Sequence, residues 1–118
     1  MINASIHFLD RHIEQGNGNR PAIVFEGETY TYHDLFYATC QAANLFAEAG
    51  LKAGDRVQII LPDSPLFIAC FFGLIRIGAI PSPISSRFAD QDYLKILSDC
   101  QPRAVVTSDE HLSIISEL

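Results

Sequence analysis

The sequence predicts an α/β fold with a parallel sheet, and two observations support this prediction. Between Arg56 and Ile84, a short run rich in Val, Ile and Leu, a longer apolar run and a second short extended run follow one another. This order is typical of a βαβ unit, whose strands pair in parallel through a right-handed crossover. The same alternation continues to Leu118, which gives a βαβαβα unit of the doubly wound type. A helix, a β-hairpin and a covering helix are predicted before it.

The N-terminal residues predict a helix followed by the hairpin. Within residues 3–15, apolar side chains recur with the spacing of one face of an amphipathic helix. These side chains are Ile6, Leu9 and Ile13, and the candidate N-caps are Asn3 and Ser5. The hairpin has its strands at residues 21–26 and 28–30, with Gly27 in the turn.

A long helix over residues 32–49 is predicted to cover this unit. Thr31 is a good N-cap, and Asp34 completes a capping box with it. The predicted inner face carries mostly small side chains, which allow close packing on a neighbouring helix. This face consists of Leu35, Ala38 or Thr39, Ala42, Phe46 and Ala49. Gly50 is expected to end the helix.

The βαβ unit begins with a strand at residues 56–61, whose near-continuous hydrophobicity predicts burial on both faces. Ser64 is the predicted N-cap of the next helix, and Pro65 takes its first position, where a missing N–H costs nothing. Residues 66–77 are apolar on almost every side, which predicts a helix that is buried all round. Gly78 is expected to end it.

The next strand, residues 79–84, contains Pro81 and Pro83. Because proline cannot donate a hydrogen bond to a neighbouring strand, this strand is expected to be short, to lie at an edge or to leave the sheet early. A loop at residues 85–89 follows and carries Arg87. The remaining predicted elements are a helix from Asp90 to Cys100 or Gln101 with Tyr93, Leu94 and Leu97 facing inward, a strand at 103–107, and a last helix from Ser108 or Asp109 to Leu118.

Composition and charge limit the functions to consider. The 118 residues are expected to form one domain or part of one. With a net charge of −6 and no run of Lys or Arg, neither nucleic acid nor an anionic membrane surface is an expected partner. No secretory signal is visible, and no apolar run has the length of a bilayer span. Cys40, Cys70 and Cys100 are expected to be buried, reduced thiols of a cytoplasmic protein.

The sequence lacks several common catalytic motifs. It has no GxGxxG, no GxxxxGK[ST] phosphate loop and no GxSxG elbow. The four histidines do not have the spacing of a metal site, and N-capping accounts for Asp63 and Ser64. Arg87 is the candidate binding residue, because it follows a parallel strand at the edge where open α/β sheets bind ligands. An arginine there could hold a phosphate, and a solvated loop arginine is the alternative.

Three segments resemble the N-terminal part of acyl- and aryl-CoA ligases of the adenylate-forming, AMP-binding superfamily. The first is HFLDRHIEQGNGNRPAIVFEGETYTYHDL, which is similar to the family's opening helix, hairpin and TYxxL helix start, and most of all to benzoate-CoA ligases. The second is AGLKAGDRVQIILPDSPLFIACFFGLIRIGAIPSPIS, with the family's GDRV at Gly54–Val57 and its GA at Gly78–Ala79. The third is QPRAVVTSD. Together they cover about residues 5–108.

This resemblance implies that residues 1–118 are a single, incomplete N-terminal subdomain of the ligase fold. The complete enzyme would adenylate a carboxylic acid with ATP and Mg²⁺ and then form a thioester with CoA or a carrier thiol. The family's phosphate loop, later ATP motifs, acid pocket and C-terminal lid have no match here, so this chain alone is expected to be inactive and to bind no cofactor. In some CoA ligases, a basic residue in the loop that matches Ser85–Phe88 approaches the CoA phosphates, and Arg87 occupies this position.

Three functional hypotheses follow. The first is an N-terminal part of an acid–thiol ligase, whose partner is the remainder of the ligase or a self-associating copy that covers exposed apolar surface. The second is a stand-alone interaction module or one half of a split ligase. The third is a small-ligand binding domain that uses the switch point of the sheet. The carboxylic acid is not identified, because no segment here matches its pocket.

Overall fold

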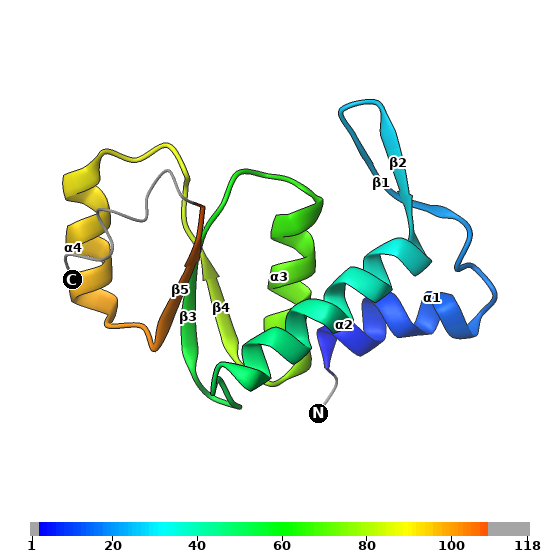
Figure 1. Ribbon diagram of the computed structural model, residues 1–118, viewed down its shortest axis with the longest axis horizontal. Coiled ribbons are helices and arrows are strands. Elements are labelled where there is room, and N and C mark those ends of the chain that lie inside the picture. The colour runs from blue at the N-terminus through cyan, green and yellow to red at the C-terminus, as the bar shows by residue number, and fades with distance from the viewer. Residues whose placement is uncertain (1–2, 109–118) are drawn as a thin grey trace.

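The computed structural model describes residues 3–108, which form a parallel sheet with helices on both faces and a separate two-stranded hairpin (Figure 1). The elements in chain order are η1 (Ile6–Asp10, a π-helical segment), α1 (Arg11–Glu14), β1 (Pro21–Phe25), β2 (Glu28–Thr31), α2 (Tyr32–Glu48), β3 (Arg56–Ile60), α3 (Pro65–Arg76), β4 (Ile80–Pro83), α4 (Asp90–Cys100) and β5 (Ala104–Thr107). The predicted α/β fold is confirmed. Among these residues, no helix has the length and hydrophobicity that crossing a membrane requires.

Strand β3 lies at the centre of the sheet, between β4 and β5, and pairs in parallel with both. Its residues Val57–Ile60 are all buried, as the near-continuous apolar run predicted. Figure 1 shows α4 on one side of the sheet and α3 with α2 on the other. The two crossovers therefore cover opposite faces of β3, which is the doubly wound arrangement.

Strand β4 is short, and within the described sheet it lies at an edge, where it pairs only with β3. The N–H groups of Ile80 and Ile84 donate to carbonyl oxygens of the chain at Asp55 and Ile59, at 2.8 and 3.0 Å. Because successive residues of a strand face opposite sides, the nitrogens of Pro81 and Pro83 are turned away from β3. The two prolines therefore cost no hydrogen bond with β3, which explains how this strand tolerates them.

The core consists of two side-chain clusters, one on each face of the sheet. The cluster on the α3 side consists of Val57, Ile59, Leu61, Cys70, Leu74 and Ala79, with Phe46 of α2 packed against it. The cluster on the α4 side consists of Ile60, Tyr93 and Leu97. The alternation of side chains along β3 distributes its apolar residues between these two clusters.

Helices α2 and α3 pack closely because a glycine lies where they meet. A Cβ atom added at Gly73 would lie 3.0 Å from the Cβ of Ala42, 3.1 Å from the backbone nitrogen of Ala43 and 3.2 Å from the carbonyl oxygen of Thr39. Two of these three atoms belong to the backbone of α2, so they cannot move away independently. The small residues that were predicted on the inner face of α2 thus allow the close contact between α2 and α3.

The N-terminal helix buries a different set of side chains from the set that was predicted. Of the two candidate caps, Asn3 is the one whose Oδ1 accepts a hydrogen bond, from the N–H of Ser5 at 3.0 Å. The π-helical segment shifts the helical period, so Ser5 and Leu9 are buried while Ile6, predicted to face inward, is 49% exposed. Arg76 at the end of α3 fixes this helix through a two-pronged ion pair with Asp10, at 2.8 and 3.0 Å.

The helix caps predicted at Thr31 and Ser64 are confirmed, but two further burial predictions, for α2 and α3, are wrong. Thr31 and Asp34 form the capping box of α2, and Ser64 accepts the N–H of Phe67 at 3.2 Å. Ala49 was predicted to face inward but is exposed, because α2 ends at Glu48. Helix α3 was predicted to be buried all round, yet Leu66 is 61% exposed. The predicted last helix lies outside the described residues.

Replacing Gly73 with Ala is expected to lower the free energy of unfolding by about 1–3 kcal/mol, because the added methyl group overpacks a contact made with backbone atoms. At an exposed helical position the same change would raise stability by up to about 1 kcal/mol, so the sign of the effect tests the contact. Urea unfolding measures it, with Asn44→Ala on exposed α2 surface as the control. A Gly73→Ala variant as stable as the parent chain would contradict the close packing of α2 on α3.

Candidate functional site

A cleft of about 580 Å³ lies at the carboxyl ends of β3 and β4. It is lined by Leu61, Pro62, Asp63 and Phe67 on one side and by Pro83, Ile84, Ser85, Ser86 and Arg87 on the other. The cleft forms here because neighbouring parallel strands end at the same edge of the sheet, where their outgoing loops separate. Open α/β sheets bind ligands at this edge, so the cleft is the candidate functional site.

The β3 side of the cleft is held by the start of α3. The hydroxyl of Ser64 accepts the N–H of Phe67 at 3.2 Å and donates to the carbonyl oxygen of Pro62 at 3.0 Å. Pro65 takes the first helical position, as predicted. These contacts fix the turn between β3 and α3. Asp63, which was grouped with Ser64 as a capping residue, instead lies exposed in the cleft wall.

The β4 side of the cleft is held by Tyr93 of α4. Its ring is fully buried, and its hydroxyl donates to the carbonyl oxygen of Ser85 at 2.7 Å. The same hydroxyl accepts the N–H of Phe88 at 3.1 Å. One side chain thus joins both ends of the segment that contains Arg87. The sequence placed Tyr93 inward but gave no partner for its hydroxyl, although a buried tyrosine hydroxyl needs one.

Arg87 lies in the wall of this cleft, in the loop after β4. Its backbone N–H donates to the hydroxyl of Ser85 at 3.1 Å, which adds a local turn to the loop. Its side chain is exposed, and within residues 3–108 its guanidinium makes no hydrogen bond or ion pair. Hydrogen bonds thus fix the loop backbone, and the loop presents the exposed guanidinium of Arg87 at the edge of the cleft. A guanidinium in this position can bind a phosphate through two parallel hydrogen bonds.

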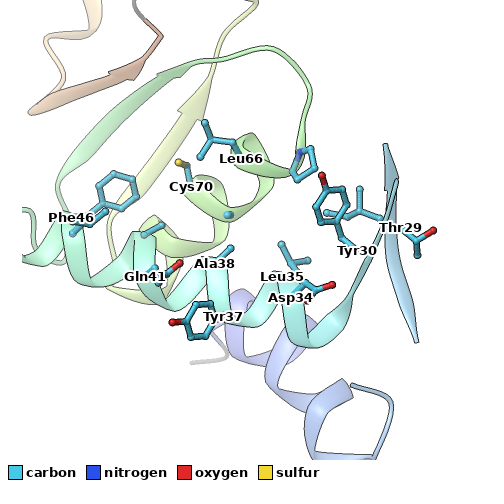
Figure 2. Close-up of a pocket in the computed structure, with 15 residues that line it drawn as sticks. Thr29, Tyr30, Asp34, Leu35, Tyr37, Ala38, Gln41, Phe46, Leu66 and Cys70 are labelled. Carbon is cyan, nitrogen blue, oxygen red and sulfur yellow. The ribbon is translucent and has the colours of Figure 1, made fainter. Parts of the chain in front are cut away.

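A second hollow, of about 730 Å³, lies between the hairpin, α2 and the start of α3 (Figure 2). We call it the apolar groove. Its lining residues are Ile23, Thr29 and Tyr30 of the hairpin, Asp34, Leu35, Tyr37, Ala38, Gln41, Ala42, Leu45 and Phe46 of α2, and Pro65, Leu66, Ala69 and Cys70 of α3. The sequence gave no indication of this groove, because apolar side chains are expected in a core whether or not something covers them.

Among residues 3–108, the cysteines and histidines have no arrangement that indicates metal chemistry. Of the three cysteines that were predicted to be buried, Cys70 is buried in the floor of the apolar groove, where burial raises the pKa of its thiol, whereas Cys40 and Cys100 are only half-buried. His12 stacks on the ring of Tyr32, with the ring centres 4.2 Å apart. In the part of the chain that the structure describes, no three His, Cys, Asp or Glu side chains gather closely enough to hold a metal ion. His111 lies outside that part.

Comparison with known proteins adds to these observations. A family model described as "AMP-binding enzyme" matches residues 9–118. The chain is 39% identical over 116 residues to an acetyl-coenzyme A synthetase of Paraburkholderia phymatum. This match covers 94% of this chain and 18% of that protein. The curated relatives are thus more than five times as long as the matched segment.

Solved structures give the same result for the fold. The N-terminal subdomain of NpsA from Klebsiella oxytoca superimposes with a TM-score of 0.82 at 26% identity, over 92% of this chain and 28% of that chain. A benzoate CoA ligase of Burkholderia xenovorans superimposes with a TM-score of 0.87 at 17% identity, over 99% of this chain and 24% of that chain. At that identity, the second likeness shows the fold alone.

Replacing Tyr93 with Phe is expected to loosen the loop that carries Arg87, because the Ser85 carbonyl and the Phe88 N–H lose their shared partner. The unmet hydrogen bonds should lower stability by about 1–2 kcal/mol. Amide hydrogen exchange should become faster first at the N–H of Phe88. The amides of β3 should exchange in the same order of rates as in the parent chain. Tyr37→Phe, which removes an exposed hydroxyl, is the control. Unchanged exchange at Phe88 would show that Tyr93 does not hold the loop.

Proposed function

Because this chain belongs to the AMP-binding enzyme family, as an N-terminal part of its fold, we propose that it is the N-terminal scaffold of an ATP-dependent acid–thiol ligase. The observation that carries this proposal is the family match over residues 9–118. The name of the P. phymatum relative, an acetyl-coenzyme A synthetase, supports a carboxylic acid and CoA as substrate classes.

The proposed reaction has two steps. In the first, a carboxylate oxygen attacks the α-phosphorus of ATP, an acyl-adenylate forms and pyrophosphate leaves. In the second, the sulfur of CoA or of a carrier thiol attacks the acyl carbonyl, a thioester forms, AMP leaves and the thiol proton passes to water or a base. We assign no residue of this chain to either bond change. The sequence has no glycine-rich phosphate loop, and among its described residues no three metal-binding side chains gather at one point, so we propose that ATP and Mg²⁺ bind to the rest of the ligase.

The contribution of this chain is structural, with one exception. We propose that Arg87 contacts a phosphate of CoA from the mouth of the cleft. Three observations support this role: the cleft lies at the ligand-binding edge of the sheet, the guanidinium has no partner among residues 3–108, and Tyr93 fixes the loop on both sides of it. Because the guanidinium lies at the surface, a phosphate can form charge-assisted hydrogen bonds with it at a small desolvation cost.

Two further parts of the proposal concern the exposed apolar surface and the cellular location. The exposed apolar surface of the chain is expected to be covered by the rest of the ligase, with self-association of the isolated chain as the competing outcome. We also propose a cytoplasmic location. The three cysteines form no disulfide with one another, which agrees with a reducing compartment.

The ligase proposal predicts that the complete polypeptide exchanges pyrophosphate into ATP only when a suitable carboxylic acid is present. In that polypeptide, Arg87→Ala is expected to raise the KM for CoA about tenfold, because one charge-assisted hydrogen bond at an exposed site is worth about 1.5 kcal/mol. The pyrophosphate exchange, which does not involve CoA, should keep its rate.

The matched control is Arg103→Ala, which removes an exposed arginine next to β5 at the opposite edge of the sheet. It should leave the KM for CoA unchanged. An unchanged KM in Arg87→Ala would return Arg87 to a solvated loop arginine, and a complete polypeptide without carboxylate-dependent exchange would contradict the ligase proposal itself.

A further inference from the structure

The cleft carries opposite charges on its two sides. Arg87 lies on the β4 side, and Asp63 lies on the β3 side. Both side chains are exposed, and within residues 3–108 neither the guanidinium nor the carboxylate makes a hydrogen bond or an ion pair. Helix capping does not explain Asp63, because the hydroxyl of Ser64 caps α3. Asp63 therefore brings negative charge to a cleft whose proposed ligand is itself an anion, and this charge needs another explanation.

The backbone on each side of the cleft holds these two charges in place. The hydroxyl of Ser64 bonds backbone groups on both sides of Asp63, at 3.0 and 3.2 Å. Tyr93 does the same on both sides of Arg87, at 2.7 and 3.1 Å. The cleft volume of about 580 Å³ is that of a cube roughly 8 Å on a side, which is shorter than the Debye length of about 10 Å at 0.1 M salt. A ligand in the cleft therefore experiences both charges.

Without Asp63, both sides of the cleft would attract anions. Helix α3 begins at Pro65, beside the cleft, and its first turn contains no acidic residue. The amino end of a helix carries a partial positive charge that favours anions. Together with Arg87, it would draw in small anions such as inorganic phosphate, which would compete with a larger ligand. Asp63 lies directly before the helix cap, so its carboxylate opposes the positive charge on the β3 side.

The two sides of the cleft also differ in the hydrogen bonds that they offer. A guanidinium only donates hydrogen bonds, and an ionised carboxylate only accepts them. A ligand that gains from both sides therefore needs an anionic group for Arg87 and a neutral N–H or O–H group for Asp63. CoA has this combination, because its phosphates are joined to a part that bears amide, amino and hydroxyl groups. A free phosphate ion spreads its negative charge over all its oxygens, so the side that it turns toward Asp63 is repelled.

We propose that Asp63 is a specificity-determining residue of the cleft, which selects a phosphate ester with a hydrogen-bond donor over free phosphate ions. The choice of CoA as this ester rests on the proposed function, whereas the repulsion of free phosphate does not. The competing explanation is that Asp63 only stabilises the start of α3 through the helix dipole. In that case its removal would change the stability of the fold and leave the choice between ligands unchanged.

Steady-state kinetics of the complete ligase test this selection. The two quantities are the KM for CoA and the inhibition constant of inorganic phosphate in competition with CoA. In Asp63→Asn, the ratio of the inhibition constant to the KM should fall about threefold to fivefold, because the amide accepts a weaker hydrogen bond from CoA and no longer repels phosphate. Asp63→Ala, which has no acceptor, should lower the ratio further. The matched control is Asp92→Asn, which removes an exposed carboxylate from the first turn of α4, outside the cleft.

A titration of the 118-residue chain with inorganic phosphate, followed by NMR at the N–H of Phe88 at constant ionic strength, needs no ligase activity. Asp63→Asn should bind phosphate about threefold more tightly, and the gain should shrink at 0.5 M KCl, where screening is stronger. Arg87→Ala should remove the response.

An unchanged phosphate affinity in Asp63→Asn, or an equal gain in Asp92→Asn, would overturn the proposal whether or not the protein is a ligase. An unchanged kinetic ratio in an active ligase would also overturn it. Tighter phosphate binding without any turnover of CoA would support the repulsion by Asp63 and refute the ligase proposal.

Discussion

The fold depends on one constraint, which is that strand β3 is buried on both faces and must be covered from both. Its alternating side chains supply one cluster with α2 and α3 and another with α4. The chain meets this constraint by sending its two crossovers to opposite faces of the sheet, so that β4 and β5 lie on either side of β3. Burial of this strand thus determines the strand order, and the strand order determines where the loops after β3 and β4 separate to form the cleft.

The cleft needs few interactions beyond those that the fold already makes. Its two sides are fixed by hydrogen bonds that the fold requires in any case: the Ser64 cap begins α3, and Tyr93 belongs to the core beneath α4. The Tyr93 hydroxyl cannot be left without partners inside that core, and the loop backbone provides them. A packing residue therefore positions the loop that presents Arg87. The apolar groove is the opposite case, because nothing within residues 3–108 covers the exposed side chains of its walls.

The sequence predicted the elements better than it predicted their environments. Helix starts such as Thr31 with Asp34, and Ser64 with Pro65, are local interactions between neighbouring residues, so they are readable from spacing alone. That β4 is short, lies at an edge or leaves the sheet early was readable for the same reason, because Pro81 and Pro83 cannot donate to a neighbouring strand. Within the described sheet β4 is both short and at an edge. The exposure of Leu66 was not readable, because an apolar pattern shows that a surface is suited to burial and not whether the cover is present. Ile6 was misplaced because a π-helical segment shifts the helical period, and the second role of Tyr93 depends on a loop that only the fold brings near.

The central claim is that these residues form a scaffold whose chemistry is completed elsewhere in a ligase. The most direct test is to incubate the purified 118-residue chain with ATP, Mg²⁺, CoA and a panel of carboxylic acids, and to measure acyl-CoA and AMP. We expect no thioester and no AMP above the level without protein, whereas the complete polypeptide should form both with its own acid. Turnover by the 118-residue chain alone would contradict the account, because it would mean that catalytic groups lie within residues to which we assign a structural role.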